Sequence, residues 1–196
     1  MALSSYDELQ TSIADYIMRP DAPIASFIAL GQADIAPRIK HYLQETVVEL
    51  TSADNKVTIP ADFQEARRIV VDGRIARPTS IYDSKRLVDE TGYYQRGNTY
   101  VFLPEQTEPR ELEITYYART PAITASNQTN WLTENNFGNA IFHAALIRAY
   151  RWMKDPDAEA MEKASLQEAL ALIAEDHHRA VGGGNQFEID FGGPLF

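Results

Sequence analysis

The chain has 196 residues, no cysteine and a formal net charge of −10 at pH 7, and 44% of its residues are hydrophobic. This length and composition are typical of one ordinary domain with its own core, and they argue against disorder throughout. Without cysteine the chain forms no disulfide and no thiolate zinc site. Its acidic balance excludes a broad basic surface that grips phosphates, although an acidic wall past which DNA slides remains compatible with it.

The N-terminal segment has neither the basic nor the apolar region of a signal peptide. No apolar run approaches the roughly 20 residues that a helix needs to cross a bilayer. We therefore expect a soluble protein in a reducing compartment, with no membrane partner.

Two helices are predicted near the N-terminus, over residues 3–18 and about 23–43, because apolar residues recur there at helical spacing. Ser5 is a suitable cap for the first helix. Gly31 and Pro37 are expected to bend or interrupt the second.

The middle of the chain, from about residue 45 to 118, changes to an apolar period of two, which predicts half-buried strands. Asp72-Gly73 and Gly97-Asn98 are hairpin signals, and residues 53–55 are expected to join the first two strands. The predicted sheet is therefore mostly antiparallel. A short helix is expected at residues 80–90.

The helical period returns after a loop at residues 120–130, with a wide apolar face that indicates deep burial. Asp155-Pro156-Asp157 predicts a restart of the helix, since an N-cap residue precedes a proline at the first helical position. The glycines at 182–184 end the last helix.

These elements predict an α+β fold, a helical bundle built from both ends of the chain with an inserted small antiparallel β-sheet subdomain and an extended C-terminal tail. We expect a single domain over residues 1–182. Its helical parts are residues 1–43 and 130–182, its inserted β-rich part is residues 44–119, and the tail is residues 183–196.

The tail alternates apolar and acidic side chains after its glycines, so its apolar residues share one face of an extended strand. A terminal strand cannot satisfy its own backbone groups, and it pairs either with its own subunit or with another chain. We expect docking onto another chain, and the alternative is a tail that is folded back on its own subunit or partly disordered. The predicted partner-binding residues are Phe187, Ile189, Phe191, Leu195 and Phe196.

No catalytic, metal or cofactor site is predicted. The four histidines lack the spacing of metal ligands. His143 is expected in a core or an interface, and His177 and His178 are expected to place positive charge at a helix C-terminus. Phosphate-binding glycine loops and a serine nucleophile elbow are absent from the sequence.

Several segments spread over most of the chain stand out together. They are Ile59-Pro60-Ala61-Asp62-Phe63 with Arg67-Arg68-Ile69, the run Leu112-Glu113-Ile114-Thr115-Tyr116-Tyr117-Ala118-Arg119 before Pro121-Ala122, Asn130-Trp131-Leu132, and the final helices through Ala144-Ala145-Leu146 and Trp152-Met153-Lys154-Asp155. In these segments and in the order of its elements, the chain resembles the head-to-tail adaptor proteins of tailed bacteriophages.

The resemblance implies a structural virion protein of the neck, assembled in the host cytoplasm, and not an enzyme. It implies a homo-oligomer, a ring of twelve subunits beneath the portal protein that presents a platform to tail or nozzle proteins. Packaged DNA would pass through the channel without specific binding. The resemblance also implies that a C-terminal extension contacts the portal, although the portal, a neighbouring subunit and a tail protein all remain open as partners of this tail.

Two alternatives stay open. One is a small phage-associated glycan hydrolase that uses a pair of acidic residues, although the sequence isolates no such pair. The other is a different ring component of the tail, such as a terminator or a stopper, which six-fold or twelve-fold symmetry would distinguish from the adaptor.

Overall fold

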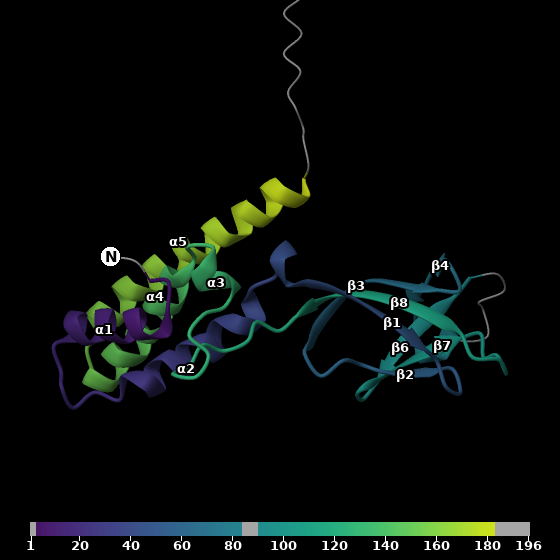
Figure 1. Ribbon diagram of the computed structural model, residues 1–196, viewed down its shortest axis with the longest axis horizontal. Coiled ribbons are helices and arrows are strands. Elements are labelled where there is room, and N and C mark those ends of the chain that lie inside the picture. Colours follow the sequence, from purple (N-terminus) through teal and green to yellow (C-terminus); the bar gives the residue numbers. More distant parts are fainter. Residues whose placement is uncertain (1–2, 84–89, 183–196) are drawn as a thin grey trace, which may run out of the picture.

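The computed structural model of the chain describes residues 3–83 and 90–182. Figure 1 shows helices at one end of an elongated molecule and strands at the other, which confirms the predicted α+β class. The five α-helices of the described residues are α1 (Tyr6–Ile17), α2 (Ile24–Ile35), α3 (Trp131–Glu134), α4 (Gly138–Met153) and α5 (Pro156–Val181). We call residues 3–39 and 120–182 the helical unit, and residues 45–118 the sheet unit.

The first two helices begin and end at local signals. Ser5 caps α1 as predicted, and its hydroxyl oxygen accepts the N–H of Glu8 at 3.3 Å. The prediction that the second helix reaches residue 43 is wrong, because α2 ends at Ile35 and a 3₁₀ turn, η1 (Ala36–Arg38), follows it. Pro37 within that turn has no N–H to continue an α-helix. A second 3₁₀ turn, η2 (Tyr42–Gln44), leads into the sheet unit.

Gly31 lies within the continuous helix α2, so the predicted interruption comes only at the proline. Its role is close packing, because a Cβ at Gly31 would lie 2.8 Å from the backbone of both Ala144 and Ala145 in α4. No side chain fits at such a separation without movement of one helix. Glycine therefore sets the distance between α2 and α4.

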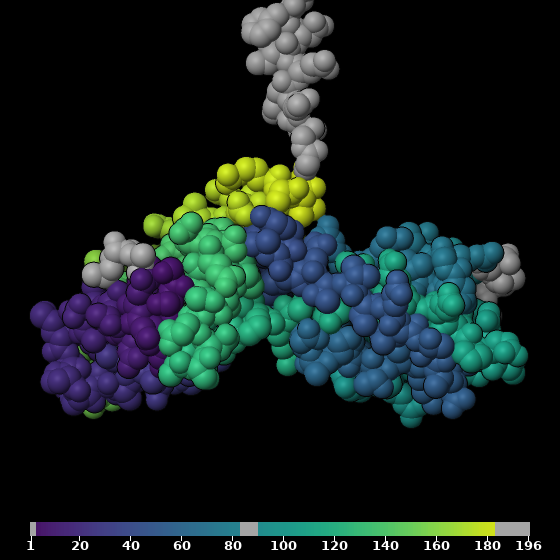
Figure 2. Space-filling model, viewed as in Figure 1, coloured from purple at the N-terminus to yellow at the C-terminus, as the bar shows by residue number. Residues whose placement is uncertain are grey.

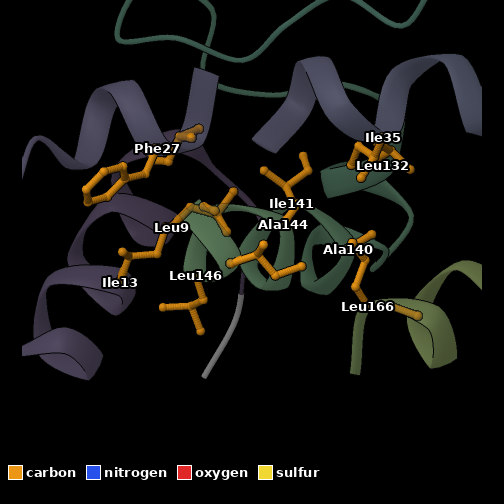
Figure 3. Packing of buried hydrophobic residues seen from close by; sticks show 14 of the residues in the cluster. Leu9, Ile13, Phe27, Ile35, Leu132, Ala140, Ile141, Ala144, Leu146 and Leu166 are labelled. Atoms are coloured by element: carbon orange, nitrogen blue, oxygen red, sulfur yellow. The ribbon is translucent and has the colours of Figure 1, made fainter. Parts of the chain in front are cut away.

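The core of the helical unit centres on α4. Figure 3 shows Leu9 of α1, Phe27 and Ile35 of α2, and Leu166 of α5 grouped around Ile141 in one apolar cluster. Figures 1 and 3 both show α4 between α2 on one side and α5 on the other. Segments from both ends of the chain thus share one core, since none of these helices can bury its apolar face alone.

The strands described within the sheet unit form two four-stranded sheets instead of the single sheet that we predicted. One has the strand order β1-β8-β3-β4 and the other β2-β7-β6-β5. All pairings are antiparallel except the short parallel pair β5–β6. The strands are β1 (Glu45–Thr51), β2 (Lys56–Thr58), β3 (Phe63–Val71), β4 (Arg74–Ile75), β5 (Arg77–Pro78), β6 (Gly92–Arg96), β7 (Thr99–Leu103) and β8 (Glu111–Ala118).

The predicted turns are present. Asp72 and Gly73 have φ values of 50° and 77° between β3 and β4, and Gly97 has a φ of 61° between β6 and β7. Asp54 and Asn55 also have positive φ, and they join β1 to β2 as predicted. The two strands nevertheless belong to different sheets, because β1 pairs with β8 and β2 pairs with β7.

The two sheets enclose a second apolar cluster, which shares no residue with the helical one. Phe102, Ile114 and Val71 are fully buried in it, and Tyr100 and Tyr116 add aromatic rings. Of the short helix predicted at residues 80–90, the structure shows a 3₁₀ turn, η3 (Ile81–Asp83), and residues 84–89 lie outside the described residues.

The last helix begins where the sequence predicts. Asp155 is its N-cap, accepting the N–H of Ala158 at 3.0 Å, and Pro156 is the first helical residue. The helix ends at Val181, directly before Gly182. The other two glycines of the predicted stop lie outside the described residues.

Candidate assembly surfaces

The tail residues predicted to bind a partner lie outside the described residues. The structure shows instead where the chain leads into the tail, since α5 ends at Val181 beside the junction between the two units. Figure 2 shows the segment around residue 42, in dark blue, against the C-terminal end of α5, in yellow. These tail residues, which we predicted to bind a partner, are Phe187, Ile189, Phe191, Leu195 and Phe196.

His177 anchors the end of α5 to η2. Its Nδ1 accepts the backbone N–H of Tyr42 at 3.0 Å, which requires an unprotonated nitrogen. Burial lowers the pKa of the His177 imidazole, and neighbouring His178 and Arg67 lower it further. The predicted role of His177 as a positive charge at the helix end is therefore wrong, because its ring acts as a neutral acceptor. His178 is exposed in the last turn of α5, and its positive charge at the helix end stays a prediction.

His41 is fully buried at the same junction, with 0% of its side chain exposed. Its ring stacks on that of Trp131, with centroids 4.8 Å apart and planes 11° apart. Its Nε2 lies 3.2 Å from the Asp176 carboxylate of α5. Burial lowers the pKa of His41, and this effect exceeds the opposite effect of Asp176. The sequence gives no signal for this residue, because its neighbours come from distant segments.

Glutamine side chains join the two units where the chain passes from one unit to the other. The amide of Gln44 donates to the carbonyl of Ala118 at 3.1 Å and to the hydroxyl of Thr120 at 3.0 Å. Gln64 of β3 donates to the carbonyl of Ile39 at 3.0 Å. Trp131 Nε1 also donates to Thr120, at 2.7 Å. The junction is thus a polar network, and it positions the end of α5 relative to the sheets.

A second buried polar contact joins α4 to α5. His143 Nδ1 lies 2.7 Å from the Glu162 carboxylate, and only 6% of Glu162 is exposed. The hydroxyl of Tyr16 lies 3.5 Å from the other carboxylate oxygen. His143 therefore lies in a packing interface, as predicted. The burial of Glu162 was missed, because nothing in the sequence distinguishes it from the exposed acids of the same helix.

The sheet unit contains a buried arginine that the sequence also did not reveal. The Arg110 side chain is 4% exposed, and its Nε donates to Asp72 at 2.8 Å. Its Nη2 donates to the Thr91 hydroxyl at 3.3 Å. Asp72 additionally accepts the N–H of Glu111 at 3.0 Å. Arg110 thus ties the β3–β4 turn to the start of β8, which is a structural role.

Large apolar side chains are exposed on several helices. Such exposure marks contact surfaces when the side chains group together, and Trp, Met and Arg are common at the centres of interfaces. Trp152 packs on Phe27, and Arg19 lies over its indole ring. The exposed large apolar residues of the helical unit are Tyr16, Met18, Leu30, Trp152, Met161, Leu172 and Val181.

Within residues 3–83 and 90–182, no group of three or more His, Asp or Glu side chains is arranged to hold a metal ion. In the same part of the chain, no helix is long and apolar enough to span a membrane. The geometry of the described residues thus offers packing surfaces and structural polar contacts.

The chain matches the sequence profile of the SU10 adaptor protein family over residues 4–186. No curated protein is significantly similar to it. The match covers both the helical unit and the sheet unit and extends past the end of α5. The chain therefore belongs to the SU10 adaptor protein family, a family of bacteriophage head-to-tail adaptor proteins, which are structural components of the virion.

Proposed function

We propose that twelve copies of the chain form a ring beneath the portal, join it to tail or nozzle proteins, and surround the channel through which DNA passes. The observation that carries this proposal is the family match over residues 4–186. The exposed apolar side chains of the helical unit support it, because a monomer in water gains nothing from such exposure. Assembly in the host cytoplasm is part of the same proposal.

The charge of the chain suits a channel that does not bind DNA. A net charge of −10 per subunit repels phosphates, so the packaged genome would slide past the ring without adhering. We expect no specific binding of duplex DNA by the assembled ring. A band shift that depends on DNA sequence at moderate salt would contradict this.

The test of the ring is cryo-electron microscopy of the full chain mixed with its own portal, examined for rotational symmetry. The expected result is twelve-fold density added beneath the portal. Six-fold density would favour a terminator or stopper ring. An unaltered portal beside free monomers, across a range of salt and stoichiometry, would overturn the proposal.

We further propose that residues 183–196 extend from a domain formed by residues 1–182 and bind the portal or a neighbouring subunit. The alternating pattern after the glycines supports this, because it places the apolar side chains on one face of a strand. The end of α5 is held at the junction by His177, so the extension would start from a fixed point. The residues proposed to contact the partner are Phe187, Ile189, Phe191, Leu195 and Phe196.

The tail is tested with two matched variants. Replacing Phe187, Ile189 and Phe191 together by serine should strongly reduce assembly on the portal, while replacing Glu188 and Asp190 by serine should reduce it much less. Both should keep the melting temperature of the unmodified chain. If the first variant melts at a lower temperature, the tail packs on its own subunit and the proposal is wrong.

A further inference from the structure

The proposed ring needs two different surfaces on each subunit, and the helical unit offers two candidates. The heterologous contacts that close a ring join one surface of a subunit to a different surface of the next subunit. The outer sides of α2 and α5 face in opposite directions, because α4 lies between these helices (Figures 1 and 3). Both helices also run from the far end of the helical unit toward the sheet unit (Figure 1).

The outer side of α2 is mainly apolar, and Ser26 is an exposed polar residue on it. The only charged residue of the helix is Asp34, and Arg148 of α4 binds both of its carboxylate oxygens. Away from α4, the helix exposes Leu30, with 49% of its area accessible, together with alanines that include Ala33. A helix that is hydrophobic on all sides is normally covered on all sides. The outer side of α2 therefore has the character of a contact surface.

A cavity of about 150 Å³ lies beside the C-terminal half of α2. Ala33, Ile39, Pro121 and Leu132 contribute to its mainly apolar lining. Gln32 also lines it, but its amide already donates to the carbonyl of Ile123 at 3.1 Å and accepts the N–H of the same residue at 2.7 Å. An apolar cavity of this size holds a benzene-sized group. It suits an aliphatic side chain of a partner.

The outer side of α5 presents two large apolar side chains, with the exposed Glu168 between them along the helix. Met161 is 73% exposed and Leu172 is 54% exposed. They are eleven residues apart, which places them about 20° apart around the helix and about 16 Å apart along it. The twelve residues of α2 span about 18 Å, so both side chains fit along its length.

We propose that α5 of one subunit packs alongside α2 of the next, with Leu172 inserted in the cavity and Met161 over the first turn of α2. This inference rests on the proposed ring. A small rotation between neighbours keeps the two helices nearly parallel, because they run in the same direction within one subunit. The partner of this surface is thus a second copy of the chain.

Charge at one end of the contact agrees with this register. Glu175 lies one turn after Leu172 on α5, and Arg38 follows the end of α2. Both are exposed, and neither forms an ion pair with another described residue. With Leu172 in the cavity, Glu175 of one subunit comes close to Arg38 of the next.

The absence of cysteine from the sequence allows a direct test by disulfide trapping. Full-length Ala33→Cys and Leu172→Cys chains are mixed, assembled on the portal and oxidised. We expect covalent dimers that reducing agent dissolves, and a ladder of larger species when one chain carries both substitutions. The matched control pairs Ala25→Cys with Leu172→Cys, which the proposed register places too far apart to link.

The outcomes separate the contact from the ring. A twelve-fold ring without Ala33–Leu172 links, or with links only in the control pair, overturns this contact and leaves the proposed function standing. If no ring forms on the portal, both fail.

A charge exchange provides an independent readout. Arg38→Glu and Glu175→Arg alone should each lower the fraction of portals that carry a complete ring, and the two substitutions combined should restore it. A combined variant no better than the single ones would contradict the proposed pairing, provided that all three keep the circular dichroism of the parent chain.

Discussion

The helical unit and the sheet unit bury different kinds of side chain. Aliphatic side chains and alanines fill the core around α4, where helices approach closely at Gly31. The sheet core is richer in aromatic rings, and Arg110 is buried beside it. The two apolar clusters share no residue, and the hydrogen bonds and stacked rings around His41 join the units. The single domain that we propose thus has two separately packed cores, and their relative position depends on the polar junction.

The largest expected effect tests whether the two cores are independent. Phe102→Ala removes a fully buried ring from the sheet unit and should lower its stability by about 3–5 kcal/mol. Because the clusters are separate, the near-ultraviolet signal of the sheet-unit tyrosines, which include Tyr100 and Tyr116, should melt well before the far-ultraviolet signal of the helices. Leu146→Ala is the matched change in the helical core, and it should move the helical transition instead. A single transition shifted by both variants would contradict independence.

Removal of the buried arginine should have the next largest effect. Arg110→Ala removes the hydrogen bonds to Asp72 and Thr91. A hydrogen bond to a charged group contributes about 1.5–3 kcal/mol to the free energy of unfolding. The loss should appear in urea unfolding of the sheet unit. Arg68→Ala is the control, because that side chain is half exposed and 4.0 Å from Glu113. An exposed pair of this kind is worth at most about 1 kcal/mol.

Because α2 and α4 approach closely at Gly31, we expect a substitution there to change stability in the direction opposite to that of helix propensity. Gly31→Ala should destabilise the chain by about 1–3 kcal/mol, because the added Cβ meets backbone atoms of α4 at 2.8 Å. In an exposed helical position the same substitution stabilises by about 1 kcal/mol. Chemical unfolding of the full chain measures the sign, and a more stable variant would show that the helices separate freely.

The smallest expected effect concerns pH at the junction. Burial lowers the pKa of both His41 and His177, so the unfolded chain binds protons at a higher pH than the folded chain does. Stability that is fully present above the unfolded pKa, about 6.5, should therefore be lost as the pH falls below it toward the lowered folded values. Thermal melts at about pH 7.5 and about pH 5.5 should differ by a few degrees.

Substitution identifies the histidine responsible. His177→Gln retains an acceptor for the N–H of Tyr42 without a titrating group, so it should reduce the pH dependence. His178→Gln changes an exposed neighbour on the same helix and should retain it. Equal pH dependence in all three chains would show that His177 does not contribute.

Local signals in the sequence predicted several elements correctly. Asp155 and Pro156 start α5, and Asp72-Gly73 turns the chain between β3 and β4, because each depends only on the backbone preferences of adjacent residues. The second helix was predicted too long, since Ile39 continues its apolar spacing although Pro37 already ends it. Ile39 is indeed buried, in the same cluster, but from an extended backbone after the 3₁₀ turn.

The sequence by itself determined the α+β class, the positions of the main turns and the resemblance to the adaptor family, because these follow from periodicity and short motifs. Only the tertiary structure decided that the strands form two sheets, that Gly31 is a contact between helices, and that His41, Arg110 and Glu162 are buried. These features depend on contacts between side chains far apart in the sequence. A local pattern does not indicate which distant segment will cover a given residue.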